Sequence, residues 1–580
     1  MNKKQCSPAD IEIIRNLFLS GAEQMRRTLV RTAVNAVIYE VLDFGISIAD
    51  RSKRMISEAA GITSFIGAND YAIGKVLDYM DSKEWQFDEG DIVMMNYPYW
   101  NSAHAADALL MAPVFIPGIE GPEMYLCVRC HWMDLGAKDV GYLTDSTDMH
   151  QEGLIMPPVK LVKKGSVDEE LMSIIKFNSR LPDAVIGASN AMVSSIRTGE
   201  RCVKEAYDKF GADLIHEALD TLIQHSENEA REAVRKLPDG TWEAHDWLDD
   251  DGITDDMIRV AVKVTIDGDR FIADYSASDP MVRGPNNMPI GATITMAKTY
   301  FKYLTTPHLP SNHGHYAPLE VIAPEGNLFH AVYPAATYVL WTKMVAFELI
   351  AKALSQAVES IPASSGADLP GFMSMGVQYQ TGKQFIVSNN EGIGWGGTYL
   401  HDGADAVQQP SGSSSRNTSI EVLEHKSNVF HERLELITDS AGPGLHRGGL
   451  GVRRDVSFAA DSDVISMKKK TKTSAWGLRG GGEPSRNGMI VWPNTDKEKL
   501  VGLKRVRMKK GDSFSNFTAG GGGWGHPYER DIDKILDDLK NEYISKDSAR
   551  DNYGVIIADD GSWSETTERL SHYNDNLNVY

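Results

Sequence analysis

The segment MYLCVRCHWMDLG, residues 124–136, supports two different interpretations of the protein. Its Cys127-Val-Arg-Cys130-His131 run matches the haem-attachment pattern C-x-x-C-H, or one half of a zinc site. The same run is also typical of a β-strand, in which side chains three residues apart point to opposite faces. Two cysteines on opposite faces cannot share one metal ion or haem, and the chain has no second C-x-x-C pair. We therefore interpret the segment as a strand that ends at His131, with two ordinary buried cysteines.

The end of this predicted strand carries the first of two H-x-x-D pairs, His131 and Asp134. The second pair lies earlier in the chain, in YPYWNSAHAAD, and consists of His104 and Asp107. Residues at positions i and i+3 share a face on a helical turn. Two imidazoles and two carboxylates suit a divalent metal of the zinc or manganese kind, and Asp43 in VLDFGIS could add a carboxylate. The alternative is a set of unconnected polar loop residues, and the spacing alone does not decide between the two.

Composition limits the classes of protein to consider. A chain of 580 residues is too long for one small core, and its net charge of −21 disfavours nucleic acid or an anionic membrane as the main partner. No apolar run approaches the ~18 residues of a membrane span, and the N-terminus does not resemble a signal peptide. Four cysteines are too few for a disulfide framework, so a reducing cytoplasm is the expected location.

The hydrophobic patterns predict a mixed α/β (α+β) fold in three parts. Residues 1–165 begin with one long amphipathic helix over 8–40 and form an α/β part with the candidate metal site. Residues 166–364 are largely helical, and residues 365–580 form a β-rich part with glycine-rich tight turns and a helical closure. The short basic run KKKTK near the end of a predicted strand is expected to be solvated.

Nucleotide and nucleophile motifs are missing from the sequence. None of the glycine-rich runs matches the phosphate-binding pattern G-x-x-x-x-G-K-[ST], and GGGGWG lacks the lysine and hydroxyl that would follow it. As turns in a β-rich body these glycines need no ligand. The serine-nucleophile pattern G-x-S-x-G and the zinc pattern H-E-x-x-H do not occur either.

Eleven segments, in order along nearly the whole chain, resemble the hydantoinase B/oxoprolinase family. They are NYPYWNSAHAAD, HWMDLGA, HQEGLIMPPVKL, NSRLPD, RGPNNM, IAPEGNLF, GGTYLHDGAD, NTSIEVLE, RLELITDSAGPGLHRGGLGVRRD, TAGGGGWGHPYERD and SARDNYGVIIA. Members of this family are partners, or fused halves, of hydantoinase A-type ATP-using subunits. They occur in N-methylhydantoinase, 5-oxoprolinase, caprolactamase and the acetone and acetophenone carboxylases. The resemblance implies a large hydantoinase B-like fold.

The resemblance also implies roles for particular residues. It places a divalent metal, zinc or manganese, on His104, Asp107 and His131, with Asp43 as a nearby acid that ligates the metal or acts as a base. Asp134 occupies a position from which it would support the metal ligands without binding the metal itself. ATP–Mg would bind at the A-type partner subunit, in keeping with the absence of a phosphate-binding loop in this sequence.

The sequence departs from the family pattern shortly before His104. The family usually reads Asn-Asp-Pro-Tyr, whereas this chain has a phenol at Tyr97 in place of the carboxylate. The pair His131 and Asp134 is followed by Gly136-Ala137 rather than by two glycines. Both changes leave the expected ligands intact. They favour a larger or more aromatic substrate than a small cyclic amide, with Tyr97 as a substrate-binding residue.

Three functions remain open from the sequence. The first is ATP-dependent hydrolysis of a cyclic amide such as a hydantoin, a lactam or 5-oxoproline, with the small-molecule carbonyl bound at the metal. The second is ATP-dependent carboxylation of a ketone, which would also use bicarbonate. The third is a non-catalytic scaffold subunit with a structural metal. In either catalytic case the isolated chain is expected to be inactive, because ATP is used by the partner.

Overall fold

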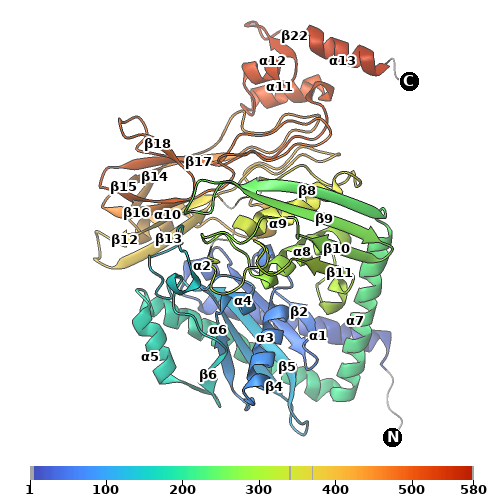
Figure 1. The fold of residues 1–580 in the computed structure, drawn as a ribbon, viewed down its shortest axis with the longest axis vertical. Helices are drawn as coiled ribbons and strands as arrows, with labels where there is room; N and C mark the ends of the chain where they lie inside the picture. Colours follow the sequence, from blue (N-terminus) through green and yellow to red (C-terminus); the bar gives the residue numbers. More distant parts are fainter. Residues whose placement is uncertain (1–5, 60, 339–340, 367, 369, 578–580) are drawn as a thin grey trace. The chain divides into compact units, whose positions relative to one another are not determined.

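The computed structural model describes residues 6–577, except 60, 339–340, 367 and 369, and these residues form two compact units (Figure 1). The first unit consists of residues up to 246, 250–350 and 414–418, and the second of 247–249, 351–413 and 419 onward. The domain boundary that we predict at 364/365 lies close to a change of unit, whereas the one at 165/166 lies inside the first unit. Within the described residues, no helix is both long enough and apolar enough to cross a bilayer.

The first unit is built on a seven-stranded antiparallel sheet with the strand order β2-β1-β5-β4-β3-β6-β7. Its strands are β1 (Phe44–Asp50), β2 (Met55–Glu58), β3 (Ile92–Met95), β4 (Asp107–Phe115), β5 (Pro122–His131), β6 (Val159–Lys163) and β7 (Ser166–Val167). The predicted strand is thus confirmed as β5, and it ends at His131. Cys127 and Cys130 are buried in different apolar cores, on opposite faces of the sheet, and both are free thiols.

Helices cover both faces of this sheet. The helices α1 (Pro8–Thr32), α6 (Pro182–Phe210) and α7 (Ala212–Arg235) share one core with it, and α3 (Asn69–Ser82) packs on the other face. Ser7 and Asp10 form a capping box at the start of α1. The prediction of one helix over residues 8–40 is wrong, because α1 ends at Thr32 and Asn35 caps a separate short helix, α2 (Ala36–Tyr39).

Four further helices and a second sheet belong to the first unit. The sheet has the order β11-β10-β9-β8, with β8 (Gly240–Leu248), β9 (Ile258–Asp267), β10 (Arg270–Asp274) and β11 (Leu319–Ile322). Other helices are α4 (Pro98–Asn101), α5 (Glu169–Asn178), α8 (Ile290–Thr305) and α9 (Trp341–Leu354). The start of α9 and the turn after α4 both supply residues to the candidate site described below.

The second unit contains two antiparallel sheets that share one apolar core. One sheet consists of β12 (Gly371–Val377), β13 (Gln384–Asn390), β16 (Ser462–Met467) and β19 (Lys504–Met508). The other consists of β14 (Val429–Leu436), β15 (Val452–Phe458), β17 (Gly488–Val491), β18 (Lys499–Val501) and β20 (Ser513–Phe517). Its helices are α10 (Ile420–Lys426), α11 (Ile532–Lys540), α12 (Lys546–Asp551) and α13 (Thr567–Leu577), and a small hairpin joins β21 (Val555–Ile557) and β22 (Trp563–Glu565).

The glycine-rich runs of the second unit form extended segments that lie side by side, visible as parallel traces in Figure 1. Gly449 donates to Trp395 O at 2.8 Å, and Gly521 donates to Gly449 O at 3.0 Å. A Cβ on Gly521 would lie 1.9 Å from the Trp395 carbonyl oxygen, so only glycine allows the backbones to approach this closely. The expectation of tight turns holds for residues 478–481, where Gly481 N donates to the Leu478 carbonyl oxygen at 2.8 Å, but other parts of these runs need glycine for backbone contact.

The prediction that the run KKKTK is solvated is wrong for its first three lysines. Lys468, Lys469 and Lys470 are all buried, and Lys468 Nζ donates to the Gly371 carbonyl oxygen at 2.7 Å. Burial lowers the pKa of Lys468 to about 8. The first three lysines of the run are therefore part of the packed interior of the second unit, whereas Lys472 is exposed.

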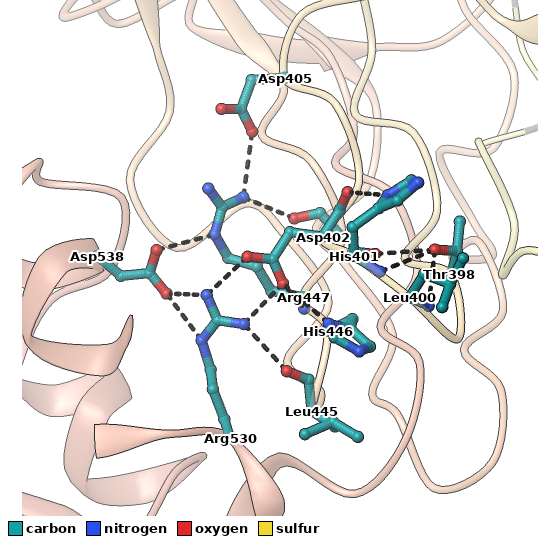
Figure 2. Close-up of polar contacts among 11 residues, drawn as sticks. Thr398, Leu400, His401, Asp402, Asp405, Leu445, His446, Arg447, Arg530 and Asp538 are labelled. Atoms are coloured by element: carbon teal, nitrogen blue, oxygen red, sulfur yellow. Dashed lines mark hydrogen bonds and ion pairs between the residues drawn. The ribbon is translucent and has the colours of Figure 1, made fainter. Parts of the chain in front are cut away.

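A network of partly buried ion pairs joins α11 to the extended segments (Figure 2). Arg530 binds both oxygens of Asp402, at 2.7 and 2.9 Å, and Asp538 at 3.0 Å. Arg447 contacts Asp538 and Asp405, each at 3.1 Å. Burial acts to raise the pKa of Asp402, but the hydrogen bonds and charge of Arg530 hold it below its usual range. Every acid and base in the network has a partner, which indicates a structural role.

Replacement of Asp402 by asparagine is expected to lower the free energy of unfolding at pH 7 by about 2–3 kcal/mol, because Arg530 keeps its charge and loses a bidentate partner. The pKa of Asp402 is depressed in the folded state, so its contribution is present above the unfolded pKa and is lost as the pH falls through the folded value. Urea unfolding at pH 7 and at about pH 3 should therefore show a smaller difference between variant and wild type at the lower pH. A difference that does not change with pH would contradict this assignment.

Candidate metal centre

The strand register brings the two predicted H-x-x-D segments together. Asp107 is the first residue of β4 and lies directly opposite His131, the last residue of β5. His104 precedes β4 in a turn in which Asp107 N donates to the His104 carbonyl oxygen at 3.0 Å. One nitrogen from each histidine and a carboxylate oxygen of Asp107 lie within 4.8 Å of one another. We refer to His104, Asp107 and His131 as the ligand triad.

All three side chains of the ligand triad are buried, and their contacts leave donor atoms unused. His131 Nδ1 lies 3.0 Å from Asp107 Oδ1, and His104 Nε2 lies 3.5 Å from the same oxygen. Among the described residues, His104 Nε2 and Asp107 Oδ2 have no hydrogen-bond partner. Buried polar atoms are rarely left without a partner, so these two atoms fit a site that a cation completes.

The electrostatics of the triad keep one imidazole neutral and ready to ligate. Burial lowers the pKa of His104 to about 3. The negative charge of Asp107 acts to raise this pKa but does not compensate for the effect of burial. Burial alone would lower the pKa of His131. The hydrogen bond to Asp107 and the negative charge of Asp107 outweigh burial and raise the pKa of His131 above its usual value. His104 Nδ1 accepts from Ala106 N at 3.2 Å, a contact that must loosen if a cation takes Nε2 and the ring proton moves to Nδ1.

Asp43 lies beside the ligand triad. The break between α1 and α2 leads the chain to this position, where Asp43 O accepts from His131 N at 3.2 Å. Its Oδ1 is enclosed and has no hydrogen-bond partner within the described part of the chain. Burial, followed by the charge of Asp107, raises the pKa of Asp43 to about 7. A carboxylate with this pKa can gain or release a proton near neutral pH, as a general base must.

Aromatic side chains that the sequence did not indicate line the triad. Tyr338 lies 4.8 Å from the His104 ring centroid, and Tyr142 is stacked on His131 at 6.1 Å. Trp341 lies 5.8 Å from Tyr142. These residues come from distant parts of the chain and carry no recognisable motif. Together they form an aromatic wall beside the triad.

Two buried cations complete the surroundings. Arg129 precedes His131 by two residues on β5, so both side chains leave the same face of the sheet. Lys343 comes from the first turn of α9. Burial lowers the pKa of Arg129 to about 10 and that of Lys343 to about 8. Neither residue stood out in the sequence as a candidate site residue.

The structure places the two remaining predicted site residues in other contacts. Asp134 Oδ1 accepts from Arg180 Nη1 at 2.8 Å and from Gly136 N at 3.3 Å, so its carboxylate stabilises the loop after β5. Tyr97 lines a cavity of about 520 Å³ with Trp100 and His150. The lining of that cavity does not include any member of the ligand triad. The substrate-binding role of Tyr97 and the supporting role of Asp134 stay predictions.

Comparison with known proteins agrees with the resemblance seen in the sequence. The family model described as hydantoinase B/oxoprolinase matches residues 7–527. The chain belongs to this family. Its relatives include an uncharacterized protein of Methanocaldococcus jannaschii, 30% identical over 94% of this chain and 96% of that protein. Caprolactamase subunit beta of Pseudomonas jessenii is 25% identical over 96% of this chain and 97% of that protein.

Two solved structures share the fold of this chain. The ATP-dependent caprolactamase from P. jessenii matches with a TM-score of 0.88 and 23% identity, over 98% of this chain and 99% of that chain. Acetone carboxylase, in a nucleotide-free structure, matches with a TM-score of 0.88 and 16% identity, over 98% of this chain and 83% of that chain. At these identities the likeness concerns the fold, and it confirms the expected mixed α/β architecture.

Proposed function

We propose that the chain is the B-type subunit of an ATP-dependent complex that hydrolyses a cyclic amide of the hydantoin, lactam or 5-oxoproline type. The observation that carries this proposal is the ligand triad, in which His104, Asp107 and His131 converge with unused donor atoms inside a closed site. Family membership supports it, and so does the name of a relative, caprolactamase subunit beta.

The chemistry of the substrate explains the need for ATP and a partner. An amide resists water because its nitrogen is a poor leaving group and its carbonyl a poor electrophile. Phosphorylation of the amide oxygen by an A-type subunit with ATP–Mg would supply the missing activation. The absence of a phosphate-binding loop from this sequence fits that division of labour.

The residues of the site have separate roles in this proposal. His104, Asp107 and His131 would hold a divalent metal, zinc or manganese, which polarises a carbonyl oxygen or a water when bound. Asp43 is the base, because its carboxylate lies beside the triad and burial brings its pKa to about 7. Tyr142, Tyr338 and Trp341 are buried or packed around the histidines, and they orient the substrate and exclude bulk water.

A second candidate function is ATP-dependent carboxylation of a ketone with bicarbonate. The aromatic wall favours it, because Tyr142, Tyr338 and Trp341 offer an apolar surface to an aromatic ketone. In that reaction Asp43 would take a proton from the carbon beside the carbonyl. The third possibility, a scaffold with a structural metal, gives no role to a carboxylate that titrates near neutral pH.

The decisive experiment is co-expression of the chain with its A-type partner, followed by measurement of ATP turnover. Hydantoins, lactams, 5-oxoproline and ketones would be screened, each with and without bicarbonate. We expect turnover with at least one cyclic amide, independent of bicarbonate, and none from the isolated chain. Turnover of ketones alone, with a bicarbonate requirement, would favour the carboxylase. Turnover by the isolated chain would contradict the assignment of ATP use to the partner.

A further inference from the structure

Two cationic side chains are buried beside the ligand triad without an ion-pair partner. Arg129 is 0% exposed, and its Nε, Nη1 and Nη2 have no hydrogen-bond partner among the residues that the structure describes. Lys343 is 4% exposed, and within the same residues its Nζ forms no hydrogen bond or ion pair. A guanidinium has five donors and an ammonium three, so a large hydrogen-bonding capacity is left unused here.

The aromatic ring beneath these cations does not compensate for their burial. Arg129 and Lys343 both lie over the ring of Phe65, each 5.5 Å from its centroid. A cation over an aromatic ring gains about 2 kcal/mol when desolvated, whereas the burial of one ion costs several kcal/mol. One ring shared by two cations therefore leaves most of that cost unmet.

The nearby carboxylates do not pair with these cations either. Asp107 and Asp43 both act on Lys343 electrostatically, but neither lies within ion-pair distance of it. Asp107 is already bound to His131. Asp70, which acts on Arg129, forms its ion pair with Lys298 instead. The carboxylates around the site are therefore paired with other side chains, or they would face the metal.

The charge balance of the site points to an anionic ligand. With a divalent metal on the triad, the positive charges are those of the metal, Arg129 and Lys343. The negative charges are those of Asp43 and Asp107, so the closed site would carry an excess of two positive charges. Such an excess in a buried site is stable only when an anion enters it.

We propose that Arg129 and Lys343 form an oxyanion subsite beside the ligand triad, which holds the phosphoryl group of the activated substrate. This inference rests on the proposed function. It specifies that the substrate is held at the site in its phosphorylated form. A doubly charged phosphoryl group matches the excess charge, and its oxygens suit the planar fork of a guanidinium. Bicarbonate or a carboxylate shares the oxyanion chemistry but carries a single charge.

Calorimetry of the metal-loaded, full-length chain with inorganic phosphate or with bicarbonate tests the subsite. We expect Lys343→Met to weaken phosphate binding at least tenfold and Lys343→Arg to keep the affinity within about threefold, since loss of one charge-assisted contact costs about 1.5–3 kcal/mol. The metal content of each variant is measured in parallel and should not change. Lys302→Met is the matched control, because Lys302 is equally buried but donates to Thr306 Oγ1 at 2.8 Å.

Thermal unfolding separates an anion subsite from a purely structural lysine. In buffer without oxyanions, Lys343→Met should unfold at the same temperature as wild type or higher, because it removes an unpaired buried charge. Added phosphate should raise the midpoint of wild type but not that of the variant. Unchanged phosphate affinity in Lys343→Met, or failure of that variant to fold, would overturn the proposal.

The two anion probes and the turnover assay keep the inferences distinct. Binding of bicarbonate but not phosphate, again lost in Lys343→Met, would support the oxyanion subsite and overturn its assignment to a phosphoryl group. If phosphate binds as expected while no cyclic amide is turned over, the subsite stands and the proposed reaction fails.

Discussion

His104→Ala is expected to remove the metal from the protein and to lower turnover by the complex at least ~10³-fold, while the chain still folds and binds its partner. The reason is that His104 supplies the neutral imidazole of the triad, with an unused Nε2 inside the site. Loss of a ligand forfeits the several kcal/mol with which a metal stabilises developing charge, and each 1.36 kcal/mol is tenfold in rate. Metal content by mass spectrometry, turnover and co-purification of the partner are the measurements.

The matched control for this variant is His225→Ala, which removes an exposed imidazole whose salt bridge to Glu229 lies on the surface of α7. It should keep metal content, activity and assembly. If His104→Ala instead abolishes assembly, the metal is structural and the scaffold function gains support. If it keeps both metal and activity, the triad is not the site.

Asp43→Asn is expected to lower kcat about 10²–10⁴-fold with the metal content retained, because a general base contributes a factor of this size. Asparagine keeps the shape of the side chain but cannot accept a proton. Activity of the wild type should rise with pH as the Asp43 carboxyl ionises. Burial raises its pKa to about 7 and a bound dication would lower it, so we expect this rise below pH 7. The residual activity of the variant should lack this rise.

Asp78→Asn is a suitable control for Asp43→Asn, because Asp78 is an exposed acid whose salt bridge to Lys53 lies on the surface. It should leave kcat and the pH profile unchanged. Loss of metal together with activity in Asp43→Asn would identify Asp43 as a ligand instead of a base. Full activity in that variant would exclude both roles.

The local parts of this site could be predicted from the sequence, because they follow from strand alternation. The prediction that β5 ends at His131, with Cys127 and Cys130 on opposite faces, needed only the period of a strand. The H-x-x-D spacing left a metal site and unconnected polar residues both open, and the resemblance selected three residues that the structure does bring together. The register of β4 against β5, which places Asp107 opposite His131, is a long-range feature that the sequence did not reveal.

The surroundings of the triad were missed because they depend on tertiary contacts. Tyr338, Trp341 and Lys343 precede or begin α9, a helix that is apolar and buried on most of its surface. Arg129 stands in a strand whose alternation only says that it faces the same way as His131. Arg129 is a candidate ligand-binding residue because its nitrogens have no hydrogen-bond partner among the described residues. That can be seen only once its spatial neighbours are known. The glycine-rich runs were predicted as tight turns for a similar reason. Close contact between distant backbone segments and tight turns both require glycine, so the composition does not distinguish them.

The most direct test of the central claim is a crystal structure of the metal-loaded protein, with anomalous diffraction collected at the absorption edges of zinc and manganese. The account predicts one anomalous peak per chain, within about 2.0–2.2 Å of a nitrogen of His104, a nitrogen of His131 and a carboxylate oxygen of Asp107. A protein that retains stoichiometric metal with its peak elsewhere, or a triad that stays empty in saturating metal, would contradict it.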